Sequence, residues 1–229
     1  VDTDIVVVGG GAAGIGAAIS AASEKRKVVL LDKNGTVGGD SVHVNVGTIC
    51  GAFYRSFSGK PTAVGYPFCK FLLSALKELD PFACAHEHTE GLYIIPYEKN
   101  VLRKVYETFL IQAGVEVYTN SLLESVQVQK GRIKSLAVVV NGKATTITVR
   151  AVVDCSGNAI VSQLAGLDIH QEEHYQGAAQ MFRVTGISQQ NDFMLNMAIR
   201  KAIAKKTGEM NWPRSYSALS LVPGSLRNG

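Results

Sequence analysis

Cysteine is scarce in this chain, and long apolar runs and a strong net charge are missing. The four cysteines include no C-x-x-C pair, which excludes a zinc ribbon and a dithiol redox centre. No apolar run approaches the roughly 18 residues of a membrane span, and no signal peptide precedes the first apolar run. The net charge of +4 is too small and scattered to favour nucleic acid. We expect a cytoplasmic protein with reduced thiols and no membrane span.

The chain is apolar enough to bury a core, with 46% hydrophobic and 18% charged residues, and its opening stretch is the most informative. Residues 5–8 (IVVV) lack polar alternation, which predicts a buried parallel strand. The sequence GGGAAG at 9–14 fits G-x-G-x-x-G and precedes a small-residue, apolar stretch at 15–23 with helical character. A second apolar run at 28–31 ends on Asp32. This order predicts a βαβ unit with a glycine turn.

Each glycine of that turn has a physical role in binding a dinucleotide. Gly9 allows a sharp turn after the strand, Gly11 lets the backbone approach a pyrophosphate, and Gly14 lets the helix pack closely on the sheet. The N–H groups of the first helical turn and the positive end of the helix dipole favour phosphate. Asp32, 18 residues after Gly14, is placed to accept hydrogen bonds from ribose hydroxyls. The alternative is a glycine turn that only packs a helix.

Downstream, the apolar pattern alternates between helical and strand periods. Asn141-Gly142 is a strong hairpin signal, and Asn191 is a suitable helix N-cap. On these patterns we predict helices at 68–76 and 97–112, a third parallel strand at 115–118, a three-stranded β-meander at 122–128, 133–140 and 145–149, a buried strand at 151–154, a strand at 181–184, and a helix from Asn191 to Lys206.

The opening motif resembles a known signature. The glycine turn, Ala18, Asp32-Lys33 and the pair Gly38-Gly39 are together similar to the amino-terminal motif of FAD-dependent oxidoreductases of the glutathione-reductase-type Rossmann superfamily. That group usually has glutamate where this chain has Asp32. The later stretch Asp154-Cys155-Ser156-Gly157-Asn158 resembles the second motif of the same superfamily, which more often reads Thr-Gly-Asp.

More narrowly, residues 153–166 followed by 180–184 are similar to the FAD-dependent oxidoreductase family that is distantly related to fumarate reductase and succinate dehydrogenase flavoproteins. The resemblance covers residues 4–186. It implies an α/β fold: a Rossmann-like parallel-sheet FAD-binding domain with a three-stranded β-meander, plus part of a second, substrate domain. The domains we expect are a discontinuous FAD-binding domain at 1–57 and 96–170, a helical insertion at 58–95, and an incomplete substrate domain at 171–229.

The same resemblance implies FAD as the cofactor, with Ser156-Gly157 near its pyrophosphate and the backbone near Leu123 facing its adenine. The residues expected to bind FAD are Gly9, Gly11, Ala12, Ala13, Gly14, Asp32, Lys33, Gly38, Gly39, Asp40, Ser41, Leu123, Ser156 and Gly157.

An enzyme of this kind transfers a hydride between flavin N5 and a small-molecule substrate, such as a small carboxylate or another small metabolite. His43 is a catalytic candidate because its segment is expected beneath the flavin ring, and Arg183 is one because a guanidinium binds carboxylates. Two alternatives stay open. One is an NAD-dependent dehydrogenase that uses the same βαβ unit, and the other is an FAD-binding subunit without chemistry of its own.

We expect no metal site. Cys84, His86 and His88 have the close spacing of metal ligands, and residues 170–174 (HQEEH) match an inverted zinc-protease pattern, but neither group has a companion cluster of ligands. The superfamily also binds flavin through a third segment near its carboxyl end, which this sequence lacks. We therefore expect an amino-terminal portion that needs another chain or segment to complete the flavin site.

Overall fold

The chain folds into two compact units, Val1–Val46 with Lys99–Met181, and Gly47–Glu98 with Phe182–Gly229. The computed structural model describes residues 1–57, 60–170, 173, 180–188, 191–213, 221–222 and 225–226. In the described part of the chain, no helix combines the length and the hydropathy that crossing a membrane would require.

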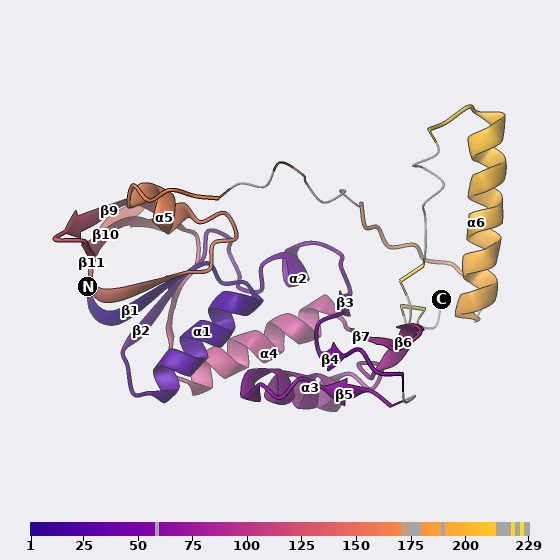
Figure 1. The fold of residues 1–229 in the computed structure, drawn as a ribbon, viewed down its shortest axis with the longest axis horizontal. Coiled ribbons are helices and arrows are strands. Elements are labelled where there is room, and N and C mark those ends of the chain that lie inside the picture. The colour runs from indigo at the N-terminus through magenta and orange to yellow at the C-terminus, as the bar shows by residue number, and fades with distance from the viewer. Residues whose placement is uncertain are drawn as a thin grey trace. The chain divides into compact units, whose positions relative to one another are not determined.

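Six strands of the first unit form one sheet in the order β8-β2-β1-β11-β10-β9 (Figure 1). They are β1 (Asp2–Val8), β2 (Val28–Leu31), β8 (Glu116–Tyr118), β9 (Ser121–Gln129), β10 (Arg132–Val140) and β11 (Lys143–Asp154). Strands β8, β2, β1 and the end of β11 pair in parallel, whereas β9, β10 and the start of β11 form an antiparallel meander. The predicted α/β fold with a three-stranded meander is confirmed.

The predicted third meander strand and the buried strand after it are a single element, β11, so the predicted break is wrong. The first part of β11 pairs antiparallel with β10 as far as Thr148, and from Thr148 to Asp154 it pairs parallel with β1. Arg150 interrupts the apolar pattern, but its side chain is 79% exposed and lies 3.4 Å from the Asp4 carboxylate. A strand in the middle of a sheet accommodates one charged residue whose side chain reaches solvent. The continuous strand brings Asp154 beside Val8, where β1 ends.

Two helices of the first unit cover the sheet near β1, β2 and β8. They are α1 (Ala12–Ser23) and α4 (Lys99–Gln112), which contact each other and the sheet. In α4 the buried residues Leu102, Val105 and Leu110 recur at helical spacing, as the sequence predicts. The short helix α2 (Asp40–His43) contacts α4, and Ser41 forms a hydrogen bond with the buried Tyr106. The loop that follows β2 is thereby attached to α4.

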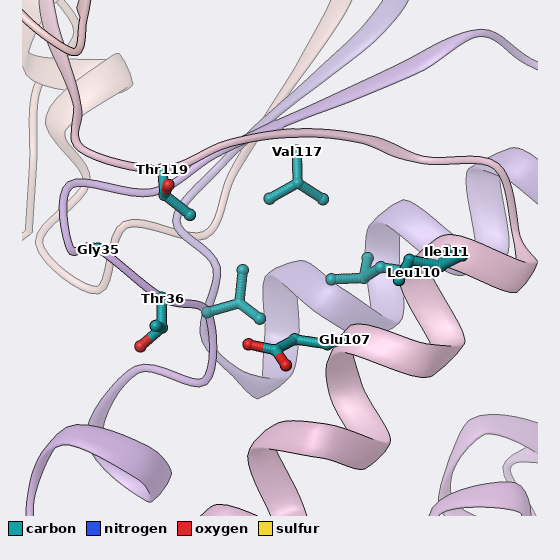
Figure 2. Close-up of a pocket in the computed structure, with 8 residues that line it drawn as sticks. Gly35, Thr36, Glu107, Leu110, Ile111, Val117 and Thr119 are labelled. Carbon is teal, nitrogen blue, oxygen red and sulfur yellow. The ribbon is translucent and has the colours of Figure 1, made fainter.

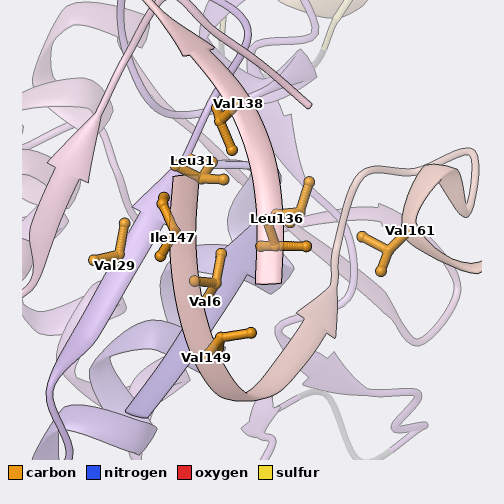
Figure 3. Close-up of a cluster of buried hydrophobic side chains, with 9 residues drawn as sticks. Val6, Val29, Leu31, Leu136, Val138, Ile147, Val149 and Val161 are labelled. Carbon is orange, nitrogen blue, oxygen red and sulfur yellow. The ribbon is translucent and has the colours of Figure 1, made fainter. Parts of the chain in front are cut away.

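Apolar side chains on one face of the sheet form a second layer of the core (Figure 3). Because successive side chains of a strand point to opposite faces, alternate residues of β1, β2, β10 and β11 gather on one side of the sheet. With Val161 of α5 (Ile160–Leu164), the cluster consists of Val6, Val8, Val29, Leu31, Leu136, Val138, Ile147, Val149 and Val161. Each such side chain contributes about 1.5–3 kcal/mol when fully buried. This packing extends to Val8 and Leu31, the last residues of β1 and β2, so it holds the carboxyl ends of both strands in place.

The second unit contains short strands and two longer helices. Its elements are β3 (Thr48–Ile49), β4 (Phe53–Tyr54), β5 (Thr62–Ala63), α3 (Pro67–Leu79), β6 (His86–Thr89), β7 (Leu92–Pro96) and α6 (Asp192–Glu209). The sequence predicted both helices but none of these strands. As predicted, the side chain of Asn191 caps α6 by accepting a hydrogen bond from the Met194 N–H at 3.0 Å. Residues 180–188 have no regular structure, and Phe182 and Val184 are exposed, so the strand predicted there is wrong.

Candidate functional site

Two glycines of the turn after β1 are required by packing alone. Gly9 has a φ of +104°, and a methyl group on it would overlap the carbonyl oxygen of Cys155 and lie 2.9 Å from the Ser156 Cα. A methyl group on Gly14 would overlap the carbonyl oxygen of Gly9. The turn therefore lies directly against the bend at residues 155–157, as we expected for two segments that bind the same molecule.

Gly11 has no such packing reason. It is the N-cap of α1 with extended backbone dihedrals, and the nearest atom to an added Cβ is the Cα of Gly39, at an ordinary contact distance of 3.9 Å. Within the described residues no side chain caps α1, and Ala12 and Ala13 of its first turn are exposed. The N–H groups of a first helical turn carry partial positive charge and need acceptors. A phosphate group fits here, because Gly11 leaves room for it beside those groups.

Asp32, the residue after β2, is 4% exposed. Its Oδ2 accepts a hydrogen bond from the Gly10 N–H at 2.7 Å, and its Oδ1 accepts one from the Asn34 N–H at 2.7 Å. The carboxylate thus joins the glycine turn to the loop that follows β2. Because each carboxylate oxygen has a second lone pair, Asp32 retains capacity to accept further hydrogen bonds. The next residue, Lys33, is exposed.

The pair Gly38-Gly39 contacts the glycine turn at residues 9–14. The Gly38 N–H donates to the carbonyl oxygen of Gly10 at 2.7 Å. Gly39 has a φ of +53°, and a methyl group on it would lie 2.9 Å from the Cα of Gly11. The following helix α2 begins with the exposed Asp40 and with Ser41, whose hydroxyl donates to the Gly38 carbonyl oxygen at 2.6 Å. The backbone of Gly10 and Gly11 therefore lies against that of Gly38 and Gly39, and together they form a surface without side chains, which we call the backbone wall.

The bend after β11 is held by the Asp154 carboxylate. Oδ1 accepts hydrogen bonds from the Ser156 N–H at 3.1 Å and the Ser156 hydroxyl at 2.6 Å, and Oδ2 accepts them from the N–H groups of Val161 at 2.9 Å and Ser162 at 3.3 Å. Burial alone would raise the pKa of Asp154, but these hydrogen bonds outweigh burial and lower it. Gly157 has a φ of +82°, and an added Cβ there would meet open space. Asp154 is not among the residues that the sequence predicts for the site.

Leu123 lies in β9 and pairs with Val138 of β10. Its side chain is partly buried against the aliphatic cluster of Figure 3. Two residues earlier, the Ser121 N–H donates to the Asp32 carbonyl oxygen at 2.9 Å, so the start of β9 adjoins the loop that follows β2. The structure thus brings the start of β9, Asp32, both glycine pairs and the Ser156 bend to one edge of the sheet. The contacts of these residues with a cofactor stay a prediction.

The two catalytic candidates lie in different units. His43 ends α2 in the first unit and is exposed, and its Nε2 lies 3.0 Å from the Thr36 carbonyl oxygen. Because a carbonyl oxygen only accepts, Nε2 carries the proton in this contact and Nδ1 is the nitrogen able to take one up. Arg183 belongs to the second unit, where its Nη2 donates to the Glu98 Oε1 at 2.7 Å. The Arg183 side chain is 63% exposed.

A cavity of about 190 Å³ lies beside α4 in the first unit (Figure 2). Its lining residues are Gly35, Thr36, Val37, Glu107, Leu110, Ile111, Val117 and Thr119. None of these is a predicted cofactor residue, although Gly35 to Val37 immediately follow the loop that contains Asp32 and Lys33. The candidate site is therefore the backbone wall at the edge of the sheet, and the lining of the cavity includes Val37, the residue before Gly38.

The sequence also offered two metal-like patterns. Among the residues that the structure describes, no group of three or more His, Cys, Asp or Glu side chains could hold a metal ion. The pattern at 170–174 includes His174, which lies outside the described residues.

Comparison with known proteins shows the family to which the chain belongs. Residues 4–221 match the family described as FAD dependent oxidoreductase. The chain belongs to this family. FAD is accordingly the cofactor of the family, and the resemblance drawn from the glycine turn and the later bend is confirmed. The residues present fit this cofactor, since the Cβ position of Gly11 is open beside the first turn of α1, which no described side chain caps.

Individual relatives match this chain only in part. A segment of 41 residues is 56% identical to urocanate reductase from Eggerthella lenta, and it covers 18% of this chain and 7% of that protein. The structure of OxyS anhydrotetracycline hydroxylase from Streptomyces rimosus superposes with a TM-score of 0.52 at 12% identity, covering 76% of this chain and 36% of that one. THI4 from Thermovibrio ammonificans gives a TM-score of 0.50 at 19% identity, covering 72% of this chain and 61% of that one. At such identities the two structures show the shared fold alone, and this chain spans less than two thirds of each of the three proteins.

Proposed function

We propose that this FAD-dependent oxidoreductase holds its cofactor at the wall formed by Gly11, Gly39 and the bend at residues 155–157, and transfers a hydride to or from a small molecule. The observation that carries the proposal is the contrast among the turn glycines. Packing explains Gly9 and Gly14, whereas among the described residues, apart from the neighbours of Gly11 in the chain, no atom lies closer than 3.9 Å to its Cβ position. A glycine with free space beside an uncapped helix is what a bound diphosphate requires.

Each part of the proposed site has a distinct task. Bound FAD supplies hydride transfer at N5 of its isoalloxazine ring. The N–H groups at the start of α1 bind the diphosphate, and Asp32 accepts hydrogen bonds from ribose hydroxyls with its remaining lone pairs. Lys33, Asp40, Ser41 and the backbone near Leu123 complete the adenosine side. In this proposal the first unit contains the FAD-binding domain, and residues 171–229 belong to a substrate domain.

The substrate class that we propose to test first is a small carboxylate. Arg183 supports this choice, because it uses one N–H of its guanidinium for Glu98 and its side chain is 63% exposed. A guanidinium has five N–H donors and binds carboxylates through two of them at once. Arg183→Lys should therefore raise the KM for a carboxylate substrate with little effect on FAD affinity. An unchanged KM would remove Arg183 from the substrate site. His43, whose Nδ1 could accept a proton, is the candidate for proton transfer.

Gly11→Ala tests the cofactor site directly. Apart from the chain neighbours of Gly11, the added methyl group meets no atom of the described residues closer than 3.9 Å, so we expect the melting temperature to stay within about 3 °C of wild type. The same methyl group occupies space that we assign to the diphosphate, and overpacking costs about 1–3 kcal/mol. The Kd for FAD, measured by quenching of flavin fluorescence, should rise about 5- to 150-fold.

Gly65→Ala is the matched control, because an added Cβ at Gly65 meets no atom of the described residues within 4 Å. This variant should bind FAD as wild type does. A Gly11→Ala protein that is folded and binds FAD as tightly as wild type would contradict the proposed site.

We also propose that residues from another chain or segment complete the flavin site. The support is that the chain spans 36% of OxyS and 61% of THI4. Light scattering and mass spectrometry on the purified protein, combined with its FAD content and turnover, test this proposal. A monomer of 24.5 kDa that holds one FAD and turns over substrate unaided would refute it.

A further inference from the structure

Cys84 occupies a fixed turn between α3 and β6 in the second unit. Asp80, which is 4% exposed, accepts a hydrogen bond from the Phe82 N–H at 3.0 Å through its carboxylate and one from the Ala83 N–H at 2.9 Å through its carbonyl oxygen. The Cys84 N–H then donates to the Phe82 carbonyl oxygen at 2.8 Å. These hydrogen bonds therefore hold the backbone at Cys84 in place, while its side chain is exposed.

His86 places an imidazole against this thiol. It begins β6 and pairs with Ile94 of β7, so its backbone belongs to a sheet. The Cys84 Sγ lies 3.4 Å from the His86 Nε2, within hydrogen-bonding distance for sulfur. In the tautomer with its proton on Nδ1, the imidazole accepts the thiol proton at Nε2. His88, two residues further along, adds no third ligand, because no metal-binding group of three forms among the described residues.

The other three cysteines lack such a base among their described contacts. Burial raises the pKa of Cys69, and burial together with the Asp154 charge raises the pKa of Cys155, so neither thiol ionises readily. Cys50 is exposed like Cys84, but its neighbour is the Thr48 hydroxyl at 4.0 Å, which is not a base at neutral pH. The chain thus contains a matched pair of exposed thiols that differ in their partner.

We propose that Cys84 is a reactive thiol, activated by His86, that forms covalent adducts with soft electrophiles such as low-molecular-weight disulfides. The thiol proton passes from Sγ to the His86 Nε2, and the thiolate attacks one sulfur of the disulfide. The Cys84 S–S bond forms as the original S–S bond breaks. The departing thiolate takes the proton from Nε2, so that Cys84 is oxidised while the other half of the reagent leaves as a reduced thiol. The proposal does not depend on FAD binding or on turnover.

The alkylation rates of the individual cysteines test whether Cys84 is a reactive thiol. The reduced full chain is treated with iodoacetamide at pH 7 for increasing times, and each cysteine peptide is quantified by mass spectrometry. An ordinary thiol is only a few per cent thiolate at pH 7, and a thiolate loses part of its nucleophilicity when a partner stabilises it. We therefore expect Cys84 to react about three- to tenfold faster than Cys50, and both to react faster than Cys69 and Cys155. With oxidised glutathione, a mass increase of one glutathionyl group should appear first on the Cys84 peptide.

His86→Asn separates activation from exposure, because asparagine retains a polar side chain but does not take up a proton at this pH. In this variant Cys84 should slow to the rate of Cys50, while the Cys50 rate stays unchanged. A Cys69 rate as slow as in wild type reports that the unit is still folded, because burial protects Cys69. His88→Asn is the matched control and should leave the Cys84 rate unchanged. Equal rates at Cys84 and Cys50 in wild type would overturn the proposal without any variant, and so would an undiminished Cys84 rate in His86→Asn.

Discussion

Removing the Asp154 carboxylate should loosen both the bend at residues 155–157 and the start of α5. The carboxylate accepts four hydrogen bonds, two from Ser156 and one each from the N–H groups of Val161 and Ser162. Alanine at this position removes all four acceptor contacts, whereas asparagine retains one oxygen but loses the charge. Neither replacement adds volume, so a loss of stability would reflect the lost hydrogen bonds.

The size of the loss follows from the four contacts. A hydrogen bond to a charged group contributes about 1.5–3 kcal/mol on its own, but bonds to one carboxylate are not additive. The Ser162 contact is long at 3.3 Å, and Asp154 is only half-buried, so water replaces part of what is lost. We expect Asp154→Ala to reduce the free energy of unfolding by about 2–3 kcal/mol, which lowers the melting temperature by about 4–12 °C in a chain of this size. Asp154→Asn should cost about half as much.

The same contacts predict the pH dependence. Because the pKa of Asp154 is lower in the folded protein than in the unfolded chain, the carboxylate stabilises the fold fully above its unfolded pKa, near pH 4. The contribution decreases as the pH falls through the folded pKa, where the carboxylate becomes protonated. The stability difference between wild type and Asp154→Asn should therefore be constant near neutral pH and shrink below about pH 4.

Urea unfolding followed by circular dichroism, from pH 7 down to the acid transition, measures this difference. Asp168→Asn is the control, because Asp168 is an exposed acid of the same unit and its replacement should change stability by less than about 0.5 kcal/mol. If Asp154→Ala were as stable as wild type at pH 7, or if the difference did not vary with pH in the acid range, the structural role given to Asp154 would be wrong.

Two further substitutions concern the turn and the loop that follows β2. Gly9→Ala should lower the free energy of unfolding by about 3 kcal/mol or more, because its methyl group overlaps the Cys155 carbonyl oxygen at a φ of +104°; a melting temperature equal to that of Gly11→Ala would contradict this. Asp32→Ala removes a charged acceptor of ribose hydroxyls worth about 1.5–3 kcal/mol, so the Kd for FAD should rise about 10- to 100-fold. Because Asp32 also binds the Gly10 N–H, this Kd must be measured on protein shown by circular dichroism to be folded, and an unchanged Kd would exclude the ribose contact.

The parts of the fold that the sequence predicts well are those with strong periodicity. The run of valines in β1 and the helical spacing in α4 each allow a single interpretation, because no charged residue interrupts the buried face. The predicted break in β11 failed for the opposite reason, since Arg150 interrupts the apolar pattern and yet its side chain reaches solvent beside Asp4. The strands of the second unit are two to five residues long, too short to show a period of two.

The sequence also identified the edge of the sheet at which the candidate site forms. The glycine turn, Asp32 and the Ser156 bend are far apart in the chain, and the parallel pairing of β1 with β2 and β11 brings them together. What the sequence did not reveal is how the edge is held together. The carboxylates of Asp32 and Asp154 both bind backbone N–H groups, and such contacts depend on loop geometry that has no periodic signal.

The glycine turn illustrates why binding and packing must be separated at the level of single atoms. In the sequence, Gly9, Gly11 and Gly14 belong to one motif, and the motif alone is compatible with either a ligand site or a tightly packed helix. In the structure, the Cβ positions of Gly9 and Gly14 are blocked by backbone, and that of Gly11 is open. Loss of FAD binding after a change at Gly9 or Gly14 would therefore reflect a damaged fold, whereas loss after Gly11→Ala in a folded protein can only reflect an obstructed ligand.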